Sequence, residues 1–190
     1  MNTLTHFRRP CLMRCSRTAA LLGCVLLPCS LASIPAEAQD RPAAHTTLFL
    51  VRHAEKSAPN GDLPLSAEGR SRAAILASML HDTGVGRIYT TEMVRTRETA
   101  EPLERALHLK AEAVPVQDVD ALVTRLRALA PGSVALVVNH SGTMPKIVEK
   151  LGGGTIEPIA EDEYDRLLIL TLTGDGKARV VTLRFGAQPR

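Results

Sequence analysis

The sequence predicts an α/β sandwich of three layers, with helices on both faces of a mostly parallel central sheet and a β-hairpin at the C-terminus. Short apolar runs rich in β-branched residues alternate with longer segments whose apolar residues recur at helical spacing. Strands that alternate with helices in this way are typical of parallel sheets. The last two apolar runs flank Gly174-Asp175-Gly176, which is a hairpin signal.

The first half of the domain is expected to alternate strand and helix twice. A buried strand is expected over 46–52, because Thr47 to Val51 form an apolar run rich in β-branched and aromatic residues. Ser66 is a suitable N-cap for a helix over 67–80. A strand over 87–90 and a helix over 93–107 follow. The apolar residues expected on the two helices are Ala73, Leu76, Met79 and Leu80, then Ala100, Leu103 and Leu107.

The second half continues the alternation with shorter elements. Residues 113–116 are expected to form a short strand, weakened by Pro115 because proline has no N–H to donate. Asp118 or Asp120 opens the next helix. The remaining elements are expected to be a strand over 133–138, a helix over 143–151, and hairpin strands over 167–173 and 178–185.

Residues 1–38 have the three parts of a cleavable secretory signal. Four arginines precede an apolar stretch over 18–33 that is too short to span a membrane, and Ala36-Glu37-Ala38 fits a cleavage site. Alternatives are an N-terminal anchor, a buried helix, or lipoprotein processing at Cys24. We expect cleavage, a tether over 39–45, a domain over 46–190, and a periplasmic or secreted protein that is not stably inserted in the membrane.

Removing this leader changes the composition. All four cysteines lie within it, so the mature chain has no thiol chemistry and no disulfides. The leader also holds four of the 23 basic residues and one of the 20 acidic residues, which leaves equal numbers of each. The net charge of +3 therefore belongs to the leader, and nothing indicates a nucleic-acid partner. The sequence does not indicate an oligomeric state.

Charged and imidazole side chains follow two of the predicted strands. Arg52-His53 ends the first strand, and Asn139-His140 ends the strand over 133–138. Since the carboxyl ends of parallel strands share one sheet edge, where α/β folds bind ligands, we expect the two histidines to lie near each other. Arg95 lies near the start of the helix that follows a third strand. Arginines and a histidine supply positive charge for phosphoryl transfer, and a neutral imidazole is a competent nucleophile.

Four segments in this order resemble the motifs of the histidine phosphatase superfamily, also called the phosphoglycerate mutase-like superfamily. They are Leu50-Val51-Arg52-His53-Ala54-Glu55, Pro64-Leu65-Ser66-Ala67-Glu68-Gly69-Arg70, Thr91 through Ala100, and Asn139-His140-Ser141-Gly142. The resemblance implies a phosphatase in which His53 becomes phosphohistidine. It also implies that Arg52 and Arg95 clamp the phosphate and that His140 and Ser141 contact it. Arg95 fits the motif because Thr99-Ala100 must follow it, which leaves Arg97 for the helix surface.

Two features depart from the family pattern. Ala54 stands where glycine is common, and Asn139 stands where the fourth motif normally begins with glycine. The proton donor for the leaving alcohol lies outside these motifs. Glu92 and Asp118 follow strands on the expected side and are candidates for this general acid. A role as helix cap or surface charge is the favoured interpretation of both, because Asp and Glu are common in first turns of helices.

The sequence therefore predicts an exported phosphatase that hydrolyses small phosphorylated substrates without a metal or other cofactor. A metal site built from His45, His53 and His140 is the alternative use of these histidines, but no His-x-x-x-His pair or acidic ligand cluster supports it. Two other functions stay open. One is a non-catalytic protein that binds phosphorylated ligands, and the other is a phosphotransferase of the phosphoglycerate mutase type.

Overall fold

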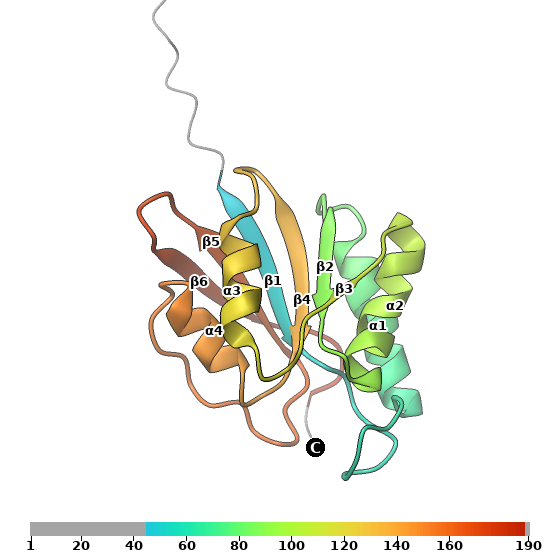
Figure 1. Cartoon of the computed structure of the whole chain (residues 1–190). Coiled ribbons are helices and arrows are strands. Elements are labelled where there is room, and N and C mark those ends of the chain that lie inside the picture. The colour runs from blue at the N-terminus through green and yellow to red at the C-terminus, as the bar shows by residue number, and fades with distance from the viewer. Residues whose placement is uncertain (1–44, 189–190) are drawn as a thin grey trace, which may run out of the picture. The chain divides into compact units, whose positions relative to one another are not determined.

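The computed structural model describes residues 45–188, which form six strands and four helices (Figure 1). The leader predicted over 1–38, and the tether before His45, lie outside the described residues. The elements are β1 (Thr46–Arg52), α1 (Ala67–Leu80), β2 (Arg87–Thr90), α2 (Val94–Leu107), β3 (Glu112–Ala113), α3 (Val119–Arg127), β4 (Val134–Asn139), α4 (Met144–Lys150), β5 (Arg166–Leu172) and β6 (Ala178–Arg184).

The strands form one sheet in the order β3-β2-β4-β1-β5-β6. The first four of these are mutually parallel. The last two, β5 and β6, are antiparallel and form the predicted hairpin, whose turn contains Gly176 at a φ of 82°. The predicted sandwich with a mostly parallel sheet and a C-terminal hairpin is confirmed.

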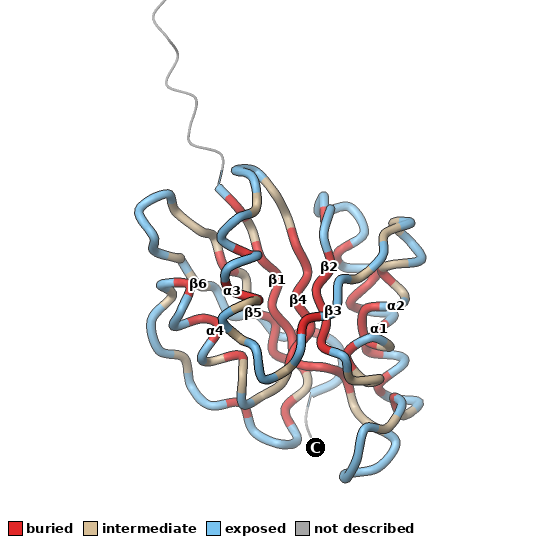
Figure 2. Tube along the Cα trace, viewed as in Figure 1, coloured by how far each residue is buried: buried red, intermediate tan, exposed pale blue. Residues whose placement is uncertain are grey.

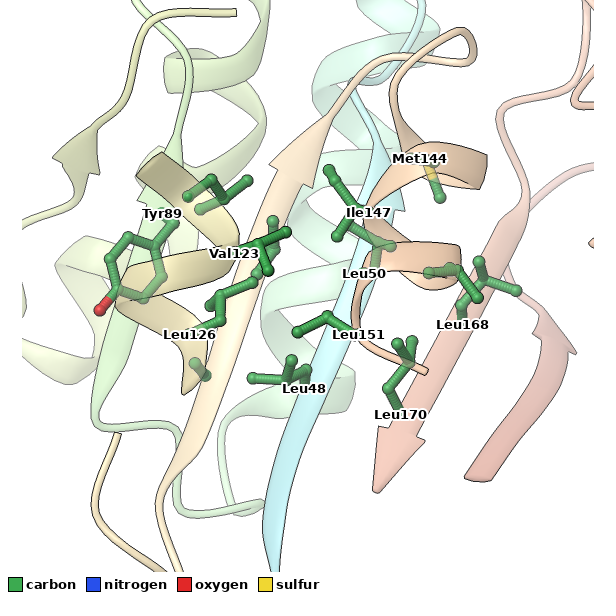
Figure 3. Close-up of a cluster of buried hydrophobic side chains, with 14 of the residues drawn as sticks. Leu48, Leu50, Tyr89, Val123, Leu126, Met144, Ile147, Leu151, Leu168 and Leu170 are labelled. Carbon is green, nitrogen blue, oxygen red and sulfur yellow. The ribbon is translucent and has the colours of Figure 1, made fainter. Parts of the chain in front are cut away.

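Apolar side chains fill the two spaces between the sheet and its helices. Alternate residues of β1 point to opposite faces, so Leu48 and Leu50 join one cluster while Phe49 and Val51 join the other. The first cluster lies under α3 and α4, where Leu126 and Ile147 are fully buried (Figure 3). The second cluster lies under α1 and α2. Burial of β1 and β4 on both faces explains their continuous apolar sequences.

Met79 lies on α1 as expected but is 42% exposed, because the buried face of that helix consists of Arg72, Leu76 and Leu80 with their small neighbours. One detail of the sequence prediction is wrong. The strand expected over 113–116 is only Glu112–Ala113. Its pairing stops where Val114 donates to the Thr90 carbonyl, directly before Pro115, which has no N–H to continue the ladder.

The parallel strands all end at the same edge of the sheet, at the bottom of Figure 1, where long connections border them. The loop over 53–66 follows β1, and the segment over 151–165 connects α4 to β5. Buried strands meet exposed loops at this edge (Figure 2). Among the residues that the structure describes, no helix combines the length and the apolarity needed to cross a membrane.

Candidate active site

Strands β1 and β4 bring the two predicted histidines together. Arg52 is aligned with Asn139 in the parallel ladder, and the backbone N–H of His53 donates to the Asn139 carbonyl at 2.9 Å. The imidazole rings of His53 and His140 lie 5.3 Å apart, edge to face. Adjacent parallel strands that each end in a histidine therefore produce the juxtaposition expected from the sequence.

His53 is held as a neutral imidazole in one tautomer. Its Nδ1 lies 2.8 Å from the Ala54 carbonyl oxygen, and because a carbonyl only accepts, Nδ1 carries the proton. Burial, together with the nearby charges of Arg52 and Arg95, lowers the pKa of His53 to about 3. The unprotonated Nε2 thus keeps its lone pair at neutral pH.

His140 is also neutral and is fixed by two neighbours. Its Nε2 lies 3.1 Å from the Thr91 hydroxyl, and its Nδ1 lies 3.5 Å from the Arg95 guanidinium. Burial and the charge of Arg95 lower the pKa of His140 to about 4, against a smaller opposing effect of Glu92. Because both histidines are neutral, the positive charge near them comes from Arg52 and Arg95.

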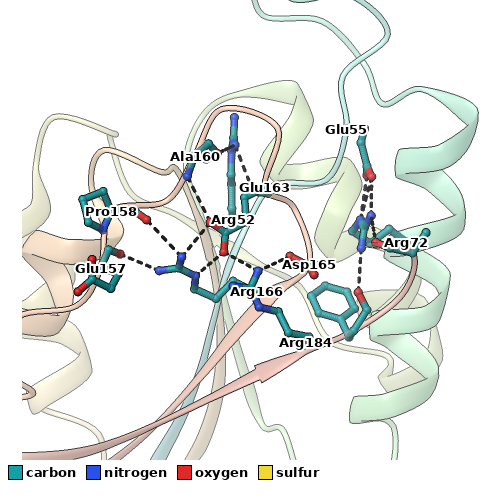
Figure 4. Close-up of polar contacts among 12 residues, drawn as sticks. Arg52, Glu55, Arg72, Glu157, Pro158, Ala160, Glu163, Asp165, Arg166 and Arg184 are labelled. Carbon is teal, nitrogen blue, oxygen red and sulfur yellow. Dashed lines mark hydrogen bonds and ion pairs between the residues drawn. The ribbon is translucent and has the colours of Figure 1, made fainter. Parts of the chain in front are cut away.

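Arg52 is buried at the end of β1 and is held by the segment before β5. Its Nη1 donates to the carbonyls of Ala160 and Glu161 at 2.7 and 2.8 Å, and to that of Glu163 at 3.2 Å (Figure 4). The guanidinium carbon lies 4.3 Å from the centre of the Tyr164 ring, a cation–π contact. Its Nε is buried and, within residues 45–188, has no hydrogen-bond partner.

Arg95, in the first turn of α2, resembles Arg52 in the state of its guanidinium group. Its Nη1 lies 3.1 Å from the Asp62 carboxylate, whereas its buried Nε has no partner in the part of the chain that the structure describes. Arg97 is exposed, as the motif register implies. Since buried N–H groups are nearly always paired, the two unpaired Nε groups are donors ready for an anion.

A buried ion network fixes the segment that holds Arg52. The Glu163 carboxylate accepts from Arg166 at 2.5 and 2.8 Å, from Arg184 at 2.7 Å and from the Ala160 N–H at 3.3 Å (Figure 4). Burial disfavours the charged carboxylate, but these donors keep the pKa of Glu163 below its usual value. Asp165 receives a second hydrogen bond from Arg184. The carbonyls around Arg52 are thereby held in place.

The other predicted site residues lie around this centre without completing it. Ser141 is half-buried in the turn before α4, and its hydroxyl has no hydrogen bond among the described residues. Glu92 accepts from the Val116 N–H, and Asp118 is the N-cap of α3. Neither carboxylate has a contact with His53 in the described range. Of the two, only Glu92 influences a site histidine, through its charge.

The structure explains why three small or polar residues occupy their positions in the motifs. The Thr99 hydroxyl accepts from the Ala54 N–H at 2.9 Å and donates to the Arg95 carbonyl at 2.7 Å, which joins the end of β1 to α2. A Cβ at Gly69 would collide with the Glu55 carbonyl oxygen, so only glycine lets α1 approach this closely. The Asn139 side chain accepts from the His140 N–H and thereby stabilises the turn where the family pattern has glycine.

Three neighbours of the site were not identified from the sequence. Tyr164 stacks on Arg52, Asp62 pairs with Arg95, and Thr91 contacts His140. Thr91 lies at the start of the third motif, and this position could have identified it as a neighbour of the site. Tyr164 and Asp62 lie in loops outside the four motifs. Across residues 45–188, no three His, Cys, Asp or Glu side chains are grouped closely enough to hold a metal ion.

Comparisons with known proteins agree with this fold. Residues 48–118 match the model for the histidine phosphatase superfamily (branch 1). The chain is similar to the protein histidine phosphatase SixA, solved with tungstate, at 22% identity and a TM-score of 0.61, covering 73% of this chain and 96% of that one. YhfR of Bacillus stearothermophilus gives 16% identity and a TM-score of 0.63, covering 75% and 98%. The alpha-ribazole phosphatase of Shigella flexneri gives 16% identity and a TM-score of 0.60, covering 75% and 99%.

A search of curated proteins by sequence found no match. At these identities the solved structures establish the fold, and the matched residues 48–118 contain three of the four sequence motifs, including Arg52, His53 and Arg95. The resemblance to the histidine phosphatase superfamily, inferred from four short motifs, is confirmed.

Proposed function

We propose that this protein is a metal-independent phosphatase that hydrolyses phosphomonoesters through a covalent phosphohistidine on His53. The observation that carries the proposal is the pairing of a neutral, buried imidazole with two arginines whose Nε groups are buried and unpaired. The first is a nucleophile, and the second supplies donors for phosphoryl oxygens. The solved relatives of this fold described as phosphatases support the same reaction class.

In the first step, the Nε2 lone pair of His53 attacks phosphorus while the bond from phosphorus to the alcohol oxygen breaks. The N–P bond forms, and the leaving oxygen takes a proton from the general acid. In the second step, water attacks the phosphohistidine and gives a proton back to the same carboxylate, the N–P bond breaks, and inorganic phosphate leaves. The Ala54 carbonyl keeps the Nδ1 proton of His53 in place, so that Nε2 is the attacking atom throughout.

In this proposal, Arg52 and Arg95 supply positive charge to the phosphoryl oxygens, and the same two arginines and the neutral His140 supply hydrogen bonds. Little covalent chemistry is required of the protein in phosphoryl transfer, so preorganised donors account for most of the rate enhancement. The carbonyls on Arg52 and the Asp62 carboxylate on Arg95 hold the two guanidinium groups before substrate arrives. Ser141 is the fourth predicted contact, through its free hydroxyl.

Glu92 is the better of the two predicted proton donors, because its charge affects His140 whereas Asp118 caps α3. A proton donor matters only when the leaving group is a poor one. The variant Glu92→Gln should therefore lose activity on an alkyl phosphate and keep it on p-nitrophenyl phosphate, whose leaving group needs no proton. Equal losses on both substrates would remove Glu92 from this role.

A second candidate is a non-catalytic protein that binds phosphorylated ligands in the same pocket. The observation that favours it is that neither predicted carboxylate contacts His53 among the described residues. The deciding assay is hydrolysis of p-nitrophenyl phosphate by residues 39–190 in the presence of a chelator, with His53→Ala as the control. Turnover that His53→Ala abolishes supports the phosphatase, whereas phosphate binding without turnover supports the binding protein. Activity lost to the chelator and restored by zinc contradicts the metal-independent mechanism.

We also propose that the protein acts in the periplasm or outside the cell. The order of basic residues, apolar stretch and Ala36-Glu37-Ala38 in the leader supports export. Expression of the full chain in a bacterium, followed by cell fractionation and N-terminal sequencing, tests this. A mature protein that begins at Gln39 in the periplasmic or secreted fraction supports the proposal. An uncleaved cytoplasmic chain contradicts it, and a chain that begins with lipid-modified Cys24 indicates a lipoprotein.

A further inference from the structure

A cavity of about 930 Å³ lies beside the catalytic pocket. The loop after His53, the first turns of α1, Asp162, Tyr164 and the residues that follow β6 line it. Tyr164 belongs to both spaces. Its ring lies 6.0 Å from the His53 ring and 4.3 Å from the Arg52 guanidinium carbon, and it also lines the cavity. Tyr164 therefore places this cavity next to the pocket that contains His53 and Arg52.

The two cations in the cavity wall are already engaged. Arg72 is buried and donates to both oxygens of Glu55 at 2.7 and 3.0 Å, and its remaining donors go to the carbonyls of Phe185 and Ala187 at 2.8 Å (Figure 4). Lys56 donates to the Pro59 carbonyl. A second anionic group in the cavity would thus meet no available guanidinium, and ammonium only at the cost of an existing hydrogen bond.

The uncommitted polar groups in the wall are neutral or negative, and they include the Gln188 amide. The Asp162 carboxylate has no ion-pair partner among the described residues, and it is exposed at the rim. The hydroxyls of Ser57 and Ser71 line the cavity and, within residues 45–188, make no hydrogen bond. A carboxylate and two hydroxyls can accept from, and donate to, the hydroxyl groups of a ligand. The same carboxylate repels an anion.

We propose that this cavity is the subsite for the leaving group, and that it selects an uncharged leaving group bearing several hydroxyls over one with a second negative charge. The inference rests on the proposed phosphatase activity and adds the class of substrate to it. The phosphoryl group would occupy the arginine and histidine pocket, Tyr164 would separate the two spaces, and the alcohol would lie against Ser57, Ser71 and Asp162.

The test compares two open-chain phosphate esters of primary alcohols. Sorbitol 6-phosphate and 6-phosphogluconate are identical from C2 to the leaving oxygen on C6 and differ only at C1, which is an alcohol in the first and a carboxylate in the second, so their ratio measures the cavity and not the chemistry. We expect kcat/KM for sorbitol 6-phosphate to be at least tenfold higher. Equal values would overturn the inference. Hydrolysis of p-nitrophenyl phosphate without hydrolysis of either sugar ester would also overturn it and leave the phosphatase proposal standing, whereas no hydrolysis of any ester overturns both.

Matched variants locate the effect. Asp162→Lys should raise kcat/KM for 6-phosphogluconate severalfold relative to sorbitol 6-phosphate, whereas Asp82→Lys, at an exposed position outside the cavity wall, should leave the ratio unchanged. Ala67 and Ala74 are both exposed on α1, but only Ala67 lines the cavity. Ala67→Trp should lower kcat/KM for sorbitol 6-phosphate at least fivefold relative to methyl phosphate, and Ala74→Trp should not. Equal behaviour within either pair would contradict the subsite.

Discussion

Replacing Arg95 by alanine should remove one of the two phosphate clamps. The Arg95 side chain is 16% exposed, its Nε is buried and unpaired, and its Nη groups reach Asp62 and His140. The loss of one preorganised donor to a developing charge costs about 3 kcal/mol of transition-state stabilisation, or more than 100-fold in kcat/KM. Arg97, two residues away in the same helix, is exposed, and its side chain has no hydrogen bond or ion pair within residues 45–188.

The assay is steady-state hydrolysis of p-nitrophenyl phosphate by Arg95→Ala and Arg97→Ala, with urea unfolding as a check on folding. Arg97→Ala should change kcat/KM less than twofold. Arg95→Lys should be intermediate, because a point charge replaces the planar fork. Equal losses at the two positions would show that the register of the third motif is wrong. A loss at Arg95 that parallels a loss of stability would show that its role is structural.

Three further variants test the support around the site. The free energy of unfolding should fall by about 2 kcal/mol per buried histidine between pH 7 and pH 5. The reason is that an unfolded histidine with a pKa near 6.5 binds a proton that folded His53, with a pKa of about 3, does not. Urea unfolding at several pH values should show a smaller dependence of this free energy on pH in His53→Asn, and an unchanged dependence would refute the neutral state of His53. Glu163→Ala should cost about 3 kcal/mol or more of stability and weaken phosphate binding, since it leaves the buried Arg166 without a carboxylate and Arg184 with Asp165 alone, whereas the exposed Glu157→Ala should do neither. Thr99→Val should cost about 1 to 3 kcal/mol by leaving the Ala54 N–H without its acceptor, and Thr124→Val, on an exposed helix face, should cost less than half of that in the same unfolding assay.

Much of the fold and the centre of the site could be predicted from local patterns. A continuous apolar run identified β1 and β4, and the shared carboxyl edge of parallel strands was enough to bring His53 and His140 together. Arg95 was placed by its spacing from Thr99, and the structure shows the reason, since Thr99 bonds to the Arg95 carbonyl and to the end of β1. Such contacts join residues that are close in the sequence, or residues at the ends of strands that the sheet topology places side by side.

The outer parts of the site depend on contacts that local patterns do not encode. Tyr164 and the carbonyls of 160–163 meet Arg52 across more than 100 residues, from a segment with no periodicity. Tyr164 could not be identified from the sequence, because a single aromatic residue in a loop belongs to no periodic pattern or motif. The exposure of Met79 has a similar cause, since the long side chain of Arg72 takes part of the buried face of α1 to reach Glu55.

The most direct test of the proposed mechanism is to trap the phosphorylated enzyme. Residues 39–190 are mixed with a substrate labelled at phosphorus and quenched within the first turnover, in acid or in alkali, and the labelled peptide is then identified. Because phosphohistidine is stable in alkali and labile in acid, we predict label on the peptide that contains His53 after alkaline quenching and its loss after acid quenching. Label that survives acid, or that lies on a serine or on His140, would contradict the central role of His53.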